Sequence, residues 1–64
     1  MKRDNQILVR LSQNEKDGFE AAAKLSGIST SAWARQKLRA AAIRELREAD
    51  MTIPFLNEVV PSDE

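Results

Sequence analysis

The chain has 64 residues, in which ten Lys and Arg balance ten Asp and Glu, and it contains neither cysteine nor histidine. A core of this size gives a domain little stability, so disulfides, a metal or oligomerisation usually supplement it. The missing residues exclude disulfides and leave only carboxylates as side-chain metal ligands, so we expect an oligomer without a metal. No apolar run approaches the roughly 20 residues that a membrane span needs. No signal-peptide pattern follows residues 1–4, and the lack of cysteine suits a cytoplasmic protein.

Charge is distributed unevenly along the chain. Positions 1–49 contain all ten basic residues and six acidic ones, whereas positions 50–64 contain four acidic residues and no basic one. This asymmetry either indicates two separate tasks or reflects chance in a short terminus. We therefore divide the chain into a basic domain over residues 1–50 and an acidic tail over residues 51–64.

One convincing β-strand is predicted, over residues 5–11. The alternation of side chains gives an apolar face of Ile7, Val9 and Leu11 and an outer face of Gln6, Leu8 and Arg10. A lone strand leaves its backbone groups without partners, and no later segment offers a second strand. The simplest partner is the same strand of a second copy, which gives an antiparallel ribbon slim enough for the DNA major groove.

Two helices are predicted after this strand. Ser12 and Glu15 match a capping box, so the first helix should span residues 13–26. Its broad apolar face comprises Phe19, Ala22, Ala23 and Leu25. The second helix should span residues 30–50, because serine and threonine offer a cap before it and Pro54 follows it. Its apolar stripe comprises Ala34, Leu38, Ala41, Ala42, Leu46 and Ala49, with Trp33 outside the stripe.

The order of these elements resembles the ribbon-helix-helix DNA-binding family of the MetJ/Arc/CopG type. The residues that carry the resemblance are the alternating strand, the cap Ser12 and the segment Gly27-Ile28-Ser29-Thr30-Ser31-Ala32-Trp33, and it covers about residues 4–48. The resemblance implies a mainly α fold with one N-terminal strand, assembled as an intertwined homodimer through an intermolecular antiparallel β-ribbon. It also implies that the ribbon enters the major groove. Leu8 departs from the family, whose outward strand positions are usually polar or basic.

This reading assigns DNA contacts to two parts of the chain. The candidate base contacts are Gln6, Leu8 and Arg10, and the candidate phosphate contacts are Lys2, Arg3, Ser29, Thr30 and Ser31. An arginine suits guanine and a glutamine suits adenine, whereas Leu8 either meets a thymine methyl or alters base reading. Free amides at a helix start can hold a phosphate. The simpler alternatives are a solvated Arg10, an ordinary helix cap and a disordered start of the chain.

Two further sets of residues are expected to make protein contacts. The candidate dimer core comprises Ile7, Val9, Leu11, Phe19, Ala22, Trp33, Ala34, Leu38, Ala41 and Ala42. The tail carries apolar side chains without a helical period, namely Phe55, Leu56, Val59 and Val60. The tail either folds onto a partner protein, or packs through Phe55 and Leu56 on the dimer's own helices, or is disordered.

The sequence contains no catalytic constellation and no phosphate-binding glycine loop, so we expect neither an enzyme nor a cofactor. The predicted function is a dimeric, sequence-specific transcriptional repressor of a palindromic or repeated DNA operator. One form of it is an autoregulating antitoxin whose tail binds a toxin. The alternatives are a plasmid copy-number or mobilisation regulator, and a helical dimer that acts only as a protein-interaction module.

Overall fold

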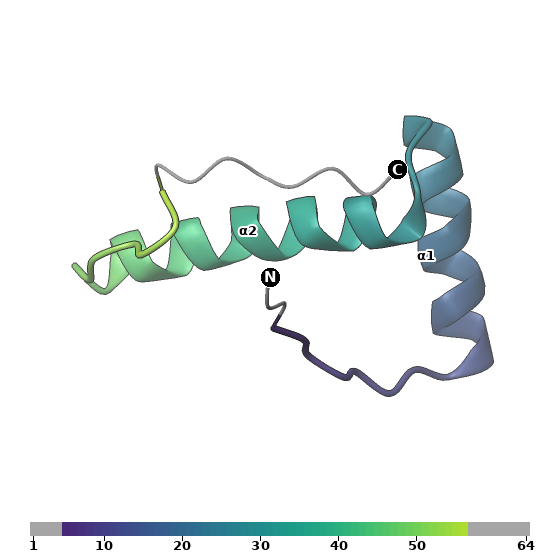
Figure 1. Ribbon diagram of the computed structural model, residues 1–64, viewed down its shortest axis with the longest axis horizontal. Coiled ribbons are helices and arrows are strands. Elements are labelled where there is room, and N and C mark those ends of the chain that lie inside the picture. The colour runs from purple at the N-terminus through teal and green to yellow at the C-terminus, as the bar shows by residue number, and fades with distance from the viewer. Residues whose placement is uncertain (1–4, 57–64) are drawn as a thin grey trace, which may run out of the picture.

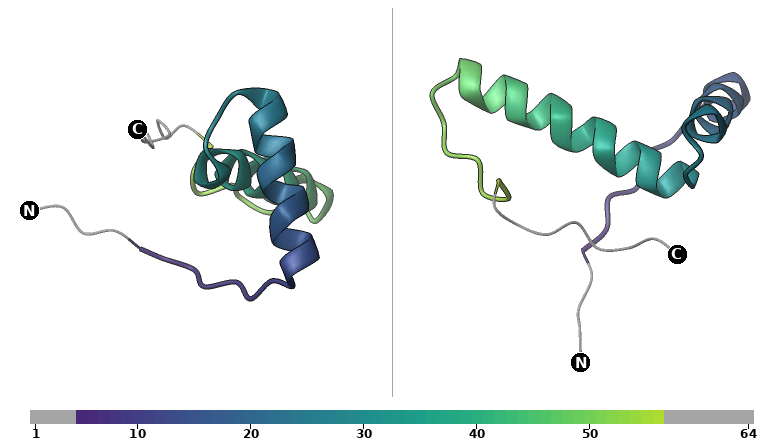
Figure 2. Two further views of the ribbon diagram at one scale, coloured as in Figure 1. Left: turned by 90° about the vertical axis from the view of Figure 1, so that its right-hand side faces the viewer. Right: turned by 90° about the horizontal axis from the view of Figure 1, so that it is seen from above.

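The computed structural model of the chain describes residues 5–56. Within this range the chain forms two helices, α1 (Gln13–Ser26) and α2 (Thr30–Glu48). The shorter α1 stands across the first turns of α2, and a non-helical segment over residues 5–12 leads into α1 (Figure 1). The two further views show that α1 and α2 cross steeply rather than lying parallel (Figure 2).

Helix α1 begins and ends as the sequence predicts. The amide of Glu15 donates to the Ser12 hydroxyl oxygen at 3.1 Å, and the Ser12 amide donates to the Glu15 carboxylate at 2.9 Å, which completes the capping box. Gly27 ends the helix with a left-handed φ of 72°. The amide of Ile28 then donates to the carbonyl oxygen of Ala23 at 3.1 Å. These bonds satisfy backbone groups that a helix end would otherwise leave free.

Helix α2 ends two residues before the predicted limit. Ser29 caps its start, since the Ser29 hydroxyl oxygen accepts from the Ala32 amide at 3.1 Å. At the other end, Asp50 adopts a left-handed φ of 58°. The amide of Met51 consequently reaches the carbonyl oxygen of Leu46 at 2.9 Å. This closing turn has an aspartate at the position where glycine is commoner. The turn at Asp50, rather than Pro54, therefore ends the helix.

The β-strand predicted over residues 5–11 is not formed, and residues 5–56 contain two helices, turns and irregular segments but no strand. The physical reason lies in the prediction itself, because the strand was expected to pair with a second copy and the structure is of one chain. Every residue from 5 to 11 is exposed. Ser12, at the end of the segment, has the extended backbone that a strand would continue, with φ −74° and ψ 164°.

The described chain has almost no buried core of its own. Only Ala23 is fully buried, with 1% of its surface exposed. Leu25, predicted to share the buried face of α1, is 92% exposed. It follows Ala23 by two positions, which is roughly 200° around a helix, so it points away from α2. Neither helix is long and apolar enough to cross a membrane, as far as residues 5–56 are concerned.

Candidate nucleic-acid interface

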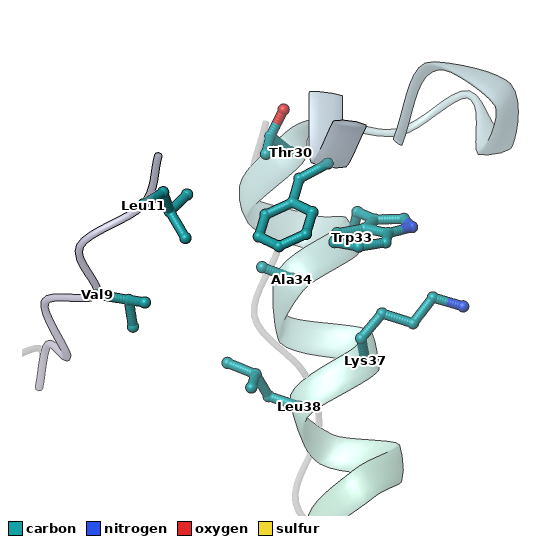
Figure 3. A pocket seen from close by; sticks show the side chains of 8 residues that line it. Val9, Leu11, Thr30, Trp33, Ala34, Lys37 and Leu38 are labelled. Carbon is teal, nitrogen blue, oxygen red and sulfur yellow. The ribbon is translucent and has the colours of Figure 1, made fainter. Parts of the chain in front are cut away.

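An open apolar groove lies between the N-terminal segment and the first half of α2. It has a volume of about 330 Å³. Its lining residues are Val9, Leu11, Phe19, Thr30, Trp33, Ala34, Lys37 and Leu38. The side chains of Val9 and Leu11 point across it toward Ala34 and Leu38 on α2 (Figure 3). Segments far apart in the sequence therefore contribute to one apolar surface.

The groove gathers six of the ten predicted dimer-core residues. These are Val9, Leu11, Phe19, Trp33, Ala34 and Leu38. Within one chain they remain poorly covered, since Val9 is 61% exposed and Leu38 is 60% exposed. Ala22, Ala41 and Ala42 are half-buried outside the groove, and Ile7 is 83% exposed. Within one chain the groove therefore remains an open apolar surface.

Two residues of the groove were not assigned to it from sequence. Thr30 was predicted only as a phosphate contact, and Lys37 was not among the predicted site residues. The Lys37 ammonium lies 5.9 Å from the centre of the Trp33 ring. The aliphatic part of the Lys37 side chain therefore covers apolar surface, while the ammonium group remains in solvent. The four-residue spacing of Trp33 and Lys37 on α2 was the available sequence signal.

The predicted base-contacting residues lie on exposed positions of the N-terminal segment. Gln6, Leu8 and Arg10 are all exposed, and none of them lines the groove. Leu8 is 87% exposed although its side chain is wholly apolar, as is the neighbouring Ile7 at 83%. The segment thus separates Val9 and Leu11, which face α2, from Leu8 and Arg10.

Helix α2 starts with a serine cap, next to the residues predicted to contact phosphate. The Ser29 hydroxyl is engaged as the cap of Ala32, and the Ser29 carbonyl accepts from Trp33 at 2.9 Å. The amides of Thr30 and Ser31 belong to the first turn, where an α-helix offers no carbonyl partner. All three residues are exposed. One hydroxyl therefore caps the helix, and the amides of Thr30 and Ser31 lie at the positive end of the helix dipole.

Part of the predicted tail lies against α2. The Arg39 guanidinium lies 4.7 Å from the centre of the Phe55 ring and donates to the Phe55 carbonyl oxygen at 3.3 Å. The Leu56 amide donates to the Ile53 carbonyl oxygen at 3.3 Å, which closes a turn. Phe55 is half-buried as a result. Lys2, Arg3, Val59 and Val60 lie outside the described residues.

The order of the elements is that of the ribbon-helix-helix class. A segment with alternating apolar residues comes first, followed by a capped helix, a glycine-serine turn and a longer helix. Residues 1–59 match the family of NikA-like mobilization proteins (Mobilization protein NikA), which is a family of this class. The match covers most of the chain, which therefore belongs to this family. No curated protein and no solved structure matches the chain.

Proposed function

We propose that the protein is a dimeric DNA-binding regulator of plasmid mobilisation. Two copies would pair their 5–11 segments into an antiparallel ribbon, place it in the major groove and hold the backbone through the starts of their α2 helices. The family match supports mobilisation over the antitoxin form of this reading. The alternative of a copy-number regulator differs only in the DNA site that is bound.

The observation that carries the proposal is the open groove beside an unpaired segment. Val9 and Leu11 line the groove, and the segment that bears them makes no strand pairing in the described chain. A second copy would satisfy both requirements at once, because it would pair the backbone groups and cover the apolar side chains. Pairing would also leave Gln6 and Arg10 on the side away from the helices.

Three features of the outer side favour duplex DNA as the ligand. Arg10 can donate two hydrogen bonds to a guanine edge, and Gln6 can exchange two with adenine. The unpaired amides of Thr30 and Ser31 suit a phosphate oxygen. The basic part of the chain, over residues 1–49, carries a net charge of +4 and would be attracted to DNA before any specific contact forms.

A gel-shift series would test DNA binding. Labelled duplexes that tile the region upstream of the chain's own gene would be titrated with the full-length protein, with random-sequence duplex as competitor. We expect one fragment to be retained against the competitor, and a footprint on it with two-fold symmetry. Absence of binding from all fragments would instead favour a module that only binds protein, and equal binding to all fragments would contradict sequence-specific recognition.

The substitution Arg10→Ala would test the ribbon on the retained fragment. We expect a loss of about 1–3 kcal/mol in binding free energy and relaxed specificity at one base pair in each half-site. Arg44→Ala is the matched control, because Arg44 is also exposed and this substitution also removes one positive charge. The control should weaken specific and non-specific binding alike. If the two substitutions weaken specific binding equally, Arg10 contributes only general electrostatic attraction and reads no base.

A further inference from the structure

The exposed Leu8 has no packing partner in the described chain, so its role must lie in the assembled ribbon. It is 87% exposed, and it stands between Gln6 and Arg10 on the side that does not line the groove. In an antiparallel pair, residues directly opposite one another point to the same face. In a symmetric ribbon one residue therefore faces the same residue of the other copy, and the two-fold axis passes midway between them.

The length of the paired segment determines which residue that is. The register that pairs all of residues 5–11 joins position 5 to 11, 6 to 10 and 7 to 9 of the other copy. Leu8 then faces the second Leu8 at the centre of the ribbon, with β-carbons roughly 4.5–5.5 Å apart. This register also accounts for Ile7, which is 83% exposed in one chain and would lie opposite Val9 of the second copy.

We propose that the two Leu8 side chains form an apolar pair on the two-fold axis and read two symmetry-related thymines through their methyl groups. This inference rests on the proposed function and adds the base chemistry at the centre of the site. Among the four bases, only thymine presents a methyl group in the major groove. Each Gln6 would flank the Leu8 pair beside Arg10 of the other copy, so the hydrogen-bonding contacts lie outside the apolar centre.

Cysteine cross-linking would test the register. The natural chain contains no cysteine, so Leu8→Cys introduces a single thiol. Facing thiols at opposed strand positions are within disulfide reach, and mild oxidation should convert the full-length dimer into a covalent one. Arg10→Cys is the matched control, since its two copies would be displaced by about four residues, or roughly 14 Å along the strands. Cross-linking through position 10 rather than 8, or through neither, would overturn the central pair.

Base substitution would test the readout. A preferred duplex would be selected from a random pool, and we expect it to carry one thymine on each strand at its centre. Replacing both thymines by uracil removes only the two methyl groups. Loss of about one buried methyl contact corresponds to roughly a fourfold weakening, so both replacements should weaken binding roughly 15-fold.

The variant Leu8→Ala completes this design. It should bind thymine and uracil duplexes with nearly equal affinity, and its melting temperature should fall only slightly, because the Leu8 pair lies on the outer face of the ribbon. Uracil replacement that leaves the parent unaffected, or that weakens both proteins equally, would overturn the methyl readout while DNA binding stands. If the protein selects no duplex, both the methyl readout and the proposed DNA-binding function are overturned. The cross-linking result would still decide the register of the ribbon.

Discussion

The centres of the Phe19 and Trp33 rings lie 5.4 Å apart, with 31° between their planes, and this contact joins α1 to α2 where both rings line the apolar groove. This tilted geometry is within the range that aromatic pairs prefer. Phe19 is half-buried in one chain, and so is Trp33. A second copy of the chain would bury more of the surface of both rings. The same two side chains would then contribute to the packing of α1 on α2 and to the dimer interface.

Phe19→Ala should therefore destabilise the folded protein. Removing the ring takes away the contact with Trp33 and leaves a cavity, so we expect a loss of about 3 kcal/mol in the free energy of unfolding. Chemical denaturation followed by fluorescence would measure it, since Trp33 is the only tryptophan. Phe19→Leu keeps most of the apolar volume and should lose about half as much. A Phe19→Ala protein as stable as the parent would show that the groove is peripheral to folding.

The melting temperature should rise with protein concentration. Among residues 5–56, one chain buries only Ala23 completely and leaves Val9 and Leu38 largely exposed, so association should supply most of the stabilising burial. Circular dichroism melts across a hundredfold range of concentration would measure the shift, and sedimentation would give the mass. A folded species of 7.2 kDa with a concentration-independent melting temperature would contradict association.

The sequence predicted local structure better than it predicted packing. Ser12, Glu15 and Gly27 act through neighbours in the chain, so the bounds of α1 followed from the sequence alone. The end of α2 was misplaced, because Asp50 takes a left-handed conformation that sequence seldom signals for a residue other than glycine. The contact between Arg39 and Phe55 joins residues 16 positions apart, and no periodic pattern relates them.

Apolar alternation placed Ile7, Val9 and Leu11 on one face of the segment. Val9 and Leu11 line the groove, whereas Ile7 does not. The alternation also placed Leu8 on the other side of the segment, where the side chain lines no part of the groove. What that side contacts depends on a second molecule, and the base-contacting and phosphate-contacting roles therefore remain predictions.

Phe55→Ala should lower the stability of the isolated protein without weakening DNA binding. The ring contacts Arg39 on α2, far along the chain from the 5–11 segment and from the start of α2. A partly exposed cation–π contact contributes about 0.5–1 kcal/mol, and loss of apolar burial adds to it. Thermal melts and the gel shift would be measured on the same preparation. Truncation after Thr52 should have the same effect, and an unchanged melting temperature in both variants would instead leave the tail available to a partner.

The two serine caps provide a matched pair that separates folding from phosphate binding. Ser12 and Ser29 each accept a hydrogen bond from a helix amide at 3.1 Å, so Ser12→Ala and Ser29→Ala should each lower stability by about 1 kcal/mol. Only Ser29 adjoins the amides proposed to hold a phosphate. At a temperature where both variants are fully folded, Ser29→Ala should weaken DNA binding, whereas Ser12→Ala should leave it unchanged. Equal losses of affinity would mean that the start of α2 acts in DNA binding only by keeping the helix folded.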